Sequence, residues 1–253
     1  FALWHWEERG LVVMLLVAPA TTLLLGFVYV IRLGPPAGQR ITITEMSHEW
    51  RTMVTLGFAF MLSGLITMLG HLSVRSLVHQ ELGPEALGQF QASWAIGMTY
   101  LAFVLGAMGT DYYPRLTAAI HDPTTATRLV NEQTEVALLL CTPVLLAMLG
   151  LAPWVIQTLY SREFAPAVDI LRWQFLGDIL KIMSWPLGFV LLASGAGRTF
   201  VLTETLGTGV FVLGVLIGLP LAGLPATGIA FFILYAVYLP TVWWFGGRKI
   251  EFK

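Results

Sequence analysis

QFLGDILKIMSWPLGFVLLASGA, residues 174–196, is long and apolar enough to cross a bilayer as a helix, yet it carries two charged side chains. Asp178 and Lys181 are three residues apart, so on a helix they share a face and are expected to neutralise each other. Ionisable groups are rare in membrane spans and mark candidate functional sites. Pro186 removes a backbone donor and predicts a kink. The stretch therefore predicts a bundle of membrane helices that supplies polar partners.

The composition of the whole chain favours the same class of protein. Of its 253 residues, 57% are hydrophobic and only 11% are charged. A water-soluble domain of this size cannot bury so much apolar surface, so we expect an all-α integral membrane protein. The net charge of −1, without a basic patch, gives no reason to expect a nucleic-acid partner. The single cysteine, Cys141, excludes an internal disulfide and is expected to pack in an apolar run.

Apolar runs along the chain predict about seven membrane spans. Their ranges are 11–31, 50–72, 86–108, 135–159, 174–196, 200–219 and 226–245. The polar connection Arg32–Met46, which contains Pro35–Pro36, is the candidate boundary between two lobes. Tight turns at Gly195–Arg198 and Pro220–Pro225 predict that the last three spans are antiparallel neighbours.

The remaining connections also carry local signals. Glu81–Gly83 followed by Pro84 predicts a helix stop and a new start. Pro114 is expected in the first turn of a short helix, and Asp122–Pro123 reads as an N-cap followed by the first helical residue. Residues 160–173, YSREFAPAVDILRW, are expected to form a short amphipathic segment at the interface.

The basic residues predict an orientation in the membrane. If the polar connection 32–49 is cytoplasmic, most of the 14 Lys and Arg residues lie on the cytoplasmic side. The residues then left outside are Arg9, Arg75, Arg162 and Arg172, while Lys181 lies within a span. The positive-inside rule favours this arrangement over the reverse.

Two alternatives are open for the charged pair in the fifth span. Asp178 and Lys181 either form a neutralised pair that fixes helix packing, or line a water-filled cavity and contact an ionic substrate or a coupling ion. Glu204 lies early in the sixth span, so it is expected near the cytoplasmic interface, where simple solvation competes with a role in transport.

Two further pairs lie at span ends. His71 and Arg75 share a helix face near the outer end of the second span, where Arg75 either snorkels to the interface or steers an anionic group. Asp111 and Arg115 flank Pro114 at the inner interface. Arg115 either pairs with Asp111 or binds a phosphate, whose geometry the guanidinium fork matches.

Most of the nine Trp residues lie near span ends, as expected for interfacial anchors. Trp94 and Trp185 are exceptions, and they either pack or line a cavity. No HExxH, P-loop, GxSxG or Cys/His metal spacing is present. The sequence therefore favours neither an enzyme nor a metal site.

Four motifs occur in an order that resembles a known family. They are LG…LGQFQA at 82–92, YYPRL at 112–116, LYSREF at 159–164, and LRWQ…GDILK…SWPLGFVLLA through Ala193. From about Trp50 to the C-terminus, the chain resembles the C-terminal half of bacterial polysaccharide flippases. These are the O-antigen (Wzx-type) translocases of the multidrug/oligosaccharidyl-lipid/polysaccharide exporter superfamily.

The resemblance implies twelve spans in two six-helix lobes around a central cavity, with both termini cytoplasmic. Residues 1–31 are then the last helix of the N-terminal lobe, 32–49 the cytoplasmic linker and 50–253 the complete C-terminal lobe. On this basis we expect the chain to be a piece of a longer protein that lacks its N-terminal part.

The implied function is export of an undecaprenyl-pyrophosphate-linked oligosaccharide, such as an O-antigen unit for lipopolysaccharide, across the bacterial inner membrane by alternating access. Lys181, Arg75 and Arg115 are the candidates to offset the charge of the pyrophosphate, while Asp178 holds Lys181 or takes a coupling H+ or Na+. Besides the lipid-linked oligosaccharide and membrane lipid, a polysaccharide polymerase and chain-length proteins are expected partners.

Two alternatives stay open. The first is a cation-coupled drug antiporter of the same superfamily, for which an acidic cavity is expected, although Lys181 argues against it. The second is a membrane scaffold that holds the polysaccharide assembly machinery without transporting anything.

Overall fold

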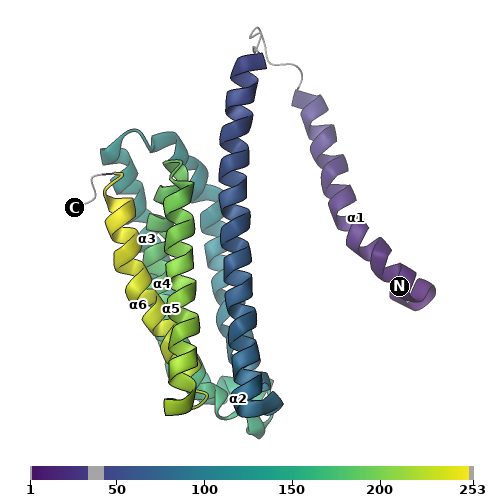
Figure 1. Ribbon diagram of the computed structural model, residues 1–253, viewed down its shortest axis with the longest axis vertical. Coiled ribbons are helices and arrows are strands. Elements are labelled where there is room, and N and C mark those ends of the chain that lie inside the picture. The colour runs from purple at the N-terminus through teal and green to yellow at the C-terminus, as the bar shows by residue number, and fades with distance from the viewer. Residues whose placement is uncertain (1, 34–42, 251–253) are drawn as a thin grey trace. The chain divides into compact units, whose positions relative to one another are not determined.

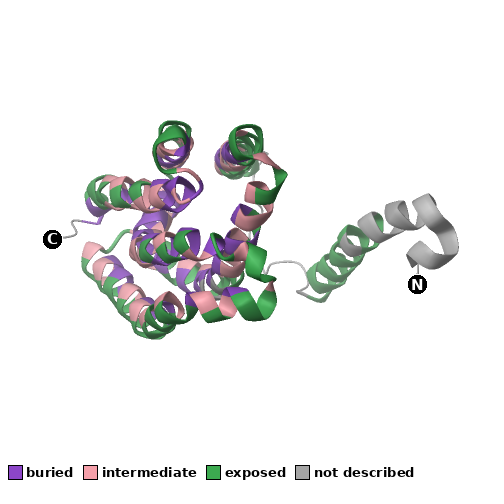
Figure 2. Ribbon diagram, turned by 90° about the horizontal axis from the view of Figure 1, so that it is seen from below, coloured by how far each residue is buried: buried purple, intermediate pink, exposed green. Residues whose placement is uncertain are grey.

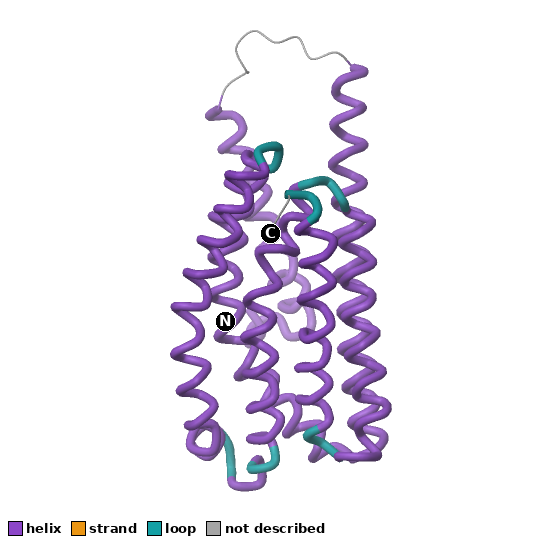
Figure 3. The backbone as a smooth tube through the Cα atoms, turned by 90° about the vertical axis from the view of Figure 1, so that its left-hand side faces the viewer, coloured by secondary structure: helices purple, strands orange, loops and turns teal. Residues whose placement is uncertain are grey.

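The computed structural model describes residues 2–33 and 43–250, and the described residues contain helices and short connections but no strand (Figures 1 and 3). The chain divides into two compact units, Phe1–Trp50 and Arg51–Lys253. The first unit contains α1 (Ala2–Leu33) and the start of α2 (Ile43–Ala119). The assignment of 1–31, 32–49 and 50–253 to a lobe end, a linker and a lobe stays a prediction.

The second unit is a helical bundle that contains the rest of α2 and the later helices. These are α3 (Pro123–Leu159), the 3-10 helix η1 (Arg162–Phe164), α4 (Ala167–Ala193), α5 (Gly197–Ala222) and α6 (Ala226–Gly247). Five of the described helical stretches are long and apolar enough to cross a membrane. The predicted all-α membrane bundle is confirmed. Each predicted span lies within one of these helices or in α1, except that the range 174–196 runs three residues past the end of α4 at Ala193.

Gly83 divides α2 into two helical halves, 43–82 and 84–119. Its φ of 87° and ψ of 179° interrupt the helix at a single residue. This region of backbone space is essentially restricted to glycine, because a Cβ would clash with the backbone there. The helix stop predicted at Glu81–Gly83 and the new start at Pro84 are confirmed, although no loop separates the two halves.

We expect Gly83→Ala to destabilise the protein by about 1–3 kcal/mol, since alanine must adopt this strained conformation or bend both halves of α2. The melting temperature of the purified full-length protein measures the effect. Gly88→Ala is the matched control, because Gly88 is helical and a Cβ there meets nothing within 4 Å. Equal melting temperatures for the two variants would contradict the strain argument.

Asp122 caps the N-terminus of α3, as predicted. Its carboxylate accepts hydrogen bonds from the backbone N–H and the hydroxyl of Thr124 and from the hydroxyl of Thr125. Pro123 occupies the first helical position, where a missing N–H costs nothing. The Thr124 and Thr125 hydrogen bonds stabilise the carboxylate and lower the pKa of Asp122 to about 2.

Because this pKa is lowered on folding, the capping interaction is present at neutral pH and is lost as the pH falls from about 3.8 towards about 2. We expect Asp122→Ala to speed hydrogen–deuterium exchange in the first turn of α3 at pH 7. Exchange in the last turn of α3 serves as the internal control. Unchanged exchange at Thr124 and Thr125 would show that the cap contributes little.

Two local predictions were wrong. Pro114 does not begin a short helix, because α2 continues through it to Ala119. One proline removes a single backbone hydrogen bond, and the buried side chains of Tyr112 and Leu116 hold this turn against the bundle. Residues 160–173 are not one amphipathic segment: η1 is three residues long, and α4 already begins at Ala167.

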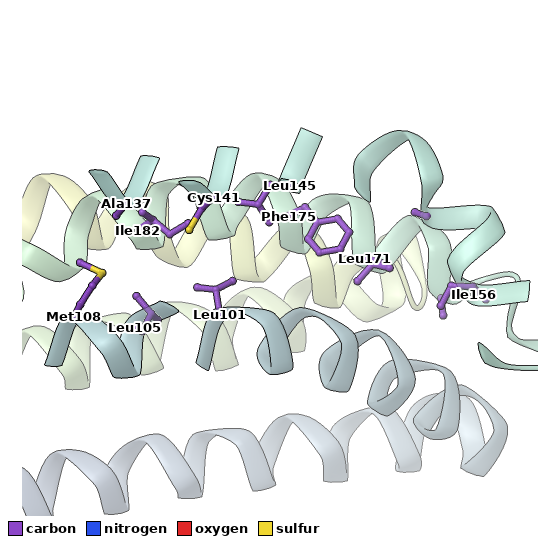
Figure 4. Close-up of a cluster of buried hydrophobic side chains, with 12 residues drawn as sticks. Leu101, Leu105, Met108, Ala137, Cys141, Leu145, Ile156, Leu171, Phe175 and Ile182 are labelled. Atoms are coloured by element: carbon purple, nitrogen blue, oxygen red, sulfur yellow. The ribbon is translucent and has the colours of Figure 1, made fainter. Parts of the chain in front are cut away.

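Helix α4 occupies the centre of the second unit, and most of its residues from Ala167 to Leu192 are buried. One apolar cluster joins α4 to the second half of α2 and to α3, and it includes Cys141, Phe175 and Ile182 (Figure 4). Figure 2 shows buried residues on the inward-facing sides of the helices in this unit and exposed residues on its outer faces. This arrangement places Asp178 and Lys181 of α4 inside the bundle, whereas Asp169 and Arg172 near its start are exposed.

Glycines allow α4 and α6 to approach each other closely. At Gly228, an added Cβ would lie 2.6 Å from the Ile170 carbonyl oxygen and 2.8 Å from the Trp173 Cβ. At Gly246, it would lie 2.9 Å from the carbonyl oxygen of Leu187. Small residues at helix contacts are typical of membrane bundles, in which packing rather than the hydrophobic effect drives helix association.

Candidate functional site

A cavity of about 350 Å³ lies in the second unit, between side chains from α2, α4, α5 and α6. Aromatic rings form much of its wall. They include Trp94, Trp185, Phe211, Phe231, Tyr235 and Tyr238. The polar lining comprises Lys181, Glu204, His71, Thr67 and Thr208. The cavity is therefore mainly aromatic, with one ammonium and one carboxylate.

Lys181 points its ammonium into this cavity and is 9% exposed. Its Nζ lies 3.7 Å from the Met98 Sδ, and 5.8 Å and 5.6 Å from the ring centres of Phe231 and Tyr235. The negative faces of aromatic rings attract a cation, and this attraction is stronger away from water. The aromatic residues of α6 and the thioether of Met98 thus hold the charge at the cavity wall.

Asp178 is fully buried and does not line the cavity. Neither of its carboxylate oxygens has a hydrogen-bond partner, and the same is true of the side-chain amide of Gln174, one turn earlier on α4. Both side chains face Gly97 on α2, where an added Cβ would lie 3.7 Å from the Gln174 Oε1 and 3.8 Å from the Asp178 Oδ2.

The expected neutralising contact between Asp178 and Lys181 is not formed. The ion pairs between the described residues lie elsewhere, and none joins these two side chains within 4.0 Å. The reason is their direction: Asp178 points towards Gly97, whereas Lys181 extends between Met98 and the α6 aromatic rings. Sharing a helix face did not bring the two charged ends together.

Glu204 lies in the cavity wall rather than in solvent at the interface. Its carboxylate accepts a hydrogen bond from the hydroxyl of Tyr238 on α6. This contact crosses from α5 to α6, so it also fixes the direction of the Glu204 side chain. Lys181 and Glu204 are thus the charged residues that the structure brings to one cavity.

The other candidates divide between the cavity and the surface. His71 lines the cavity, with its ring centre 4.5 Å from that of Trp94 and 5.8 Å from that of Phe211. Arg75 is exposed and outside the lining, in keeping with the snorkelling alternative.

Arg115 and Asp111 form an ion pair on an exposed face of α2. The Arg115 Nη1 lies 3.2 Å from the Asp111 Oδ2, and the side chains are 56% and 74% exposed. This contact matches the alternative in which the two residues simply pair. An exposed pair of this kind contributes little to stability.

Several residues of the site carried no sequence signal strong enough to single them out. Phe231, Tyr235 and Tyr238 lie within an apolar span, where aromatic residues usually pack. The spacing of Tyr235 and Tyr238, three residues apart and away from the span ends, is the clue that could have found them. Gln174 was overlooked because a single amide in a span is less conspicuous than a charge.

Among the side chains that the structure describes, no three from His, Cys, Asp or Glu are grouped as a metal site requires. The described residues instead combine apolar membrane helices with a partly charged cavity between them. These features define a multi-pass α-helical membrane protein with a cavity inside its helical bundle.

Residues 10–169 match the family model described as polysaccharide biosynthesis protein. The chain belongs to this family, so the resemblance noted in the sequence is confirmed. It is 24% identical over 149 residues to the Lipid III flippase of Escherichia coli (strain K12), covering 57% of this chain and 36% of that protein. The chain therefore spans about a third of this relative. The present chain is thus part of a multi-pass protein of the bacterial inner membrane.

Solved structures of the MOP superfamily have a similar fold. An outward-facing multidrug resistance MATE family transporter aligns with a TM-score of 0.69 and 19% identity, over 80% of this chain and 47% of that one. A crystal structure of a MATE point mutant aligns with a TM-score of 0.74 and 17% identity, over 80% and 46% of the two chains. At these identities the likeness concerns the fold alone.

Proposed function

We propose that this chain forms one lobe, and the last helix of the other, of a flippase that exports undecaprenyl-pyrophosphate-linked oligosaccharides, such as O-antigen units. The observation that carries the proposal is the cavity of a polysaccharide biosynthesis family member, with Lys181 and Glu204 in its wall. A lipid-linked sugar must take a polar head group through hydrocarbon, and burying polar groups without partners is costly. Side chains in such a cavity replace part of the lost hydration.

The geometry suggests a division of roles. Lys181 offers hydrogen-bond donors to the head group inside the cavity. Arg75 and Arg115, which are exposed on α2, would meet phosphates at the two membrane surfaces. Rocking of the two lobes against each other would then expose this cavity of the C-terminal lobe to each side in turn, with residues 32–49 as the linker between the lobes.

Asp178 and Gln174 are the proposed site of the coupling ion, H+ or Na+. A buried carboxylate without a hydrogen-bond partner is unfavourable unless a proton or cation joins it, and the amide of Gln174 next to it is also unsatisfied. Because Asp178 lies one turn from Lys181 on α4, an ion bound at Asp178 can change the electrostatic potential in the cavity.

Complementation tests the proposed activity. The full-length protein is expressed in a strain that lacks its own O-antigen flippase, and surface polysaccharide is the readout. We expect the wild type to restore the polymer. Glu204→Leu is expected to reduce it at an equal membrane level, because the variant loses the carboxylate held by Tyr238. Accumulation of lipid-linked units inside the cell despite good expression would argue against the proposal.

A drug antiporter is the second candidate function, because MATE transporters share the fold and a carboxylate lies in the aromatic cavity. Lipophilic cations bind to such walls. Lys181 opposes them, since its ammonium is in the same cavity and repels a cationic drug. Protection of cells against ethidium or tetraphenylphosphonium, without restored polysaccharide, would favour this alternative.

A further inference from the structure

We infer that the cavity binds a sugar ring of the substrate, with Trp94 as its stacking face, and does not bind the pyrophosphate. This inference rests on the proposed flippase function and deepens it. It assigns the two polar parts of the head group to different places on the chain: the sugar to the aromatic cavity, and the pyrophosphate to exposed basic residues at the helix surface.

The charges of the cavity disfavour a pyrophosphate. Its wall carries one ammonium, from Lys181, and one carboxylate, from Glu204, while His71 is packed against aromatic rings. Pyrophosphate sites require an excess of cations or backbone donors, because each phosphate is an anion with several acceptor oxygens. The carboxylate of Glu204 would repel such a ligand at close range. None of the described residues in this lining is an arginine, the side chain that suits phosphate best.

The same wall suits a pyranose ring. A sugar presents C–H groups on one face and hydroxyl or amide groups around its rim. The C–H groups carry a small positive charge, so they pack on the negative face of an aromatic ring, as the positive edges of other aromatic rings do. The rim groups need partners, and Glu204, Lys181, Thr67 and Thr208 provide both acceptors and donors around the cavity.

Trp94 is the residue best fixed to serve as this face. Its ring lies between those of His71, Phe211 and Phe231, with centres 4.5, 6.1 and 5.5 Å away. The contacts with His71 and Phe231 are edge-on, while Phe211 is stacked. A ring held from several sides loses little freedom when a ligand packs on it, which favours binding.

The volume of the cavity suits one part of the substrate rather than the whole lipid-linked oligosaccharide. About 350 Å³ lies near the lower end of the range for small-molecule sites. Such a space accommodates a small piece of the head group, and the polyprenyl chain can stay in the surrounding lipid. Each of the described lining residues belongs to the unit Arg51–Lys253.

Two lipid probes separate the sugar from the pyrophosphate. Undecaprenyl pyrophosphate and the same lipid carrying the first sugars of the host's repeat unit are bound to the purified full-length protein in nanodiscs. For the wild type, we expect the sugar-bearing lipid to bind at least about ten-fold more tightly. Trp94→Leu should reduce that preference to about two-fold or less, while the affinity for the sugar-free lipid stays within about two-fold of the wild-type value.

Trp94→Tyr and Trp173→Leu are the controls. Tyrosine keeps an aromatic face and should retain most of the preference. Trp173 packs on Phe232 outside the cavity, so its loss should leave the preference unchanged. If Trp94→Leu weakens both lipids equally while complementation by the wild type succeeds, the pyrophosphate binds here and the inference is wrong, although the flippase function stands.

Failure of the proposed function has a different signature. The wild type would then bind neither lipid specifically and would not restore surface polysaccharide, and tetraphenylphosphonium would compete for the cavity instead. That outcome overturns the sugar subsite together with the flippase. A wild type that binds both lipids equally overturns the subsite alone.

Discussion

Lys181→Met is expected to reduce export of the lipid-linked oligosaccharide by at least about ten-fold, while the protein remains folded. Methionine fills a similar volume between Met98, Phe231 and Tyr235. Replacing a buried charge with an apolar side chain of similar size is often neutral or stabilising. The variant therefore separates a role in transport from a role in packing.

Surface polysaccharide in the complemented flippase-deficient strain is the measurement, normalised to the amount of protein in the membrane. Lys181→Arg, which keeps the charge and the donors, should retain more export than Lys181→Met. A melting temperature at or above that of the wild type would show that the loss is not due to unfolding. Full export by Lys181→Met would reduce the lysine to a packing residue.

Gly228→Ala is expected to destabilise the protein by about 1–3 kcal/mol from overpacking alone. The new Cβ would lie 2.6 Å from the carbonyl oxygen of Ile170 and 3.1 Å from its Cα. These are backbone atoms of α4, so no flexible side chain can move aside to make room. Helices α4 and α6 must separate, which also disturbs the cavity wall formed by Phe231 and Tyr235.

The melting temperature of the full-length protein and its level in the membrane report this effect. Gly209→Ala is the matched control, because Gly209 lies in the interior of α5 and an added Cβ there meets nothing within 4 Å. We expect the control to behave like the wild type or slightly better, given the higher helix propensity of alanine. If Gly228→Ala is equally stable, the close approach of the two helices is not required.

Much of the fold could be predicted from the sequence, because hydrophobic length and turn residues act locally. The apolar runs predicted where the long helices lie, the Glu81–Pro84 signal placed the break in α2, and Asp122–Pro123 placed the start of α3. Pro114 was misjudged, since its effect on the helix depends on how Tyr112 and Leu116 pack against other helices. Tertiary packing of this kind leaves no local trace.

The candidate site was predictable only in part. Charges within spans identified Lys181, Asp178 and Glu204, because such residues are conspicuous against an apolar background. Their spacing could not show that Lys181 turns towards α6 while Asp178 faces Gly97 on α2, since both directions depend on neighbouring helices. The aromatic wall was harder to predict still, because aromatic residues in spans normally pack against each other.

Reconstituted translocation tests the central proposal most directly. The full-length protein is placed in proteoliposomes loaded with the host's undecaprenyl-pyrophosphate-linked oligosaccharide, and arrival of the sugar in the opposite leaflet is followed with a membrane-impermeant lectin or glycosidase. We predict translocation that is fast with the wild type and falls to the protein-free rate with Lys181→Met. Equal rates with and without the wild-type protein would contradict the flippase account.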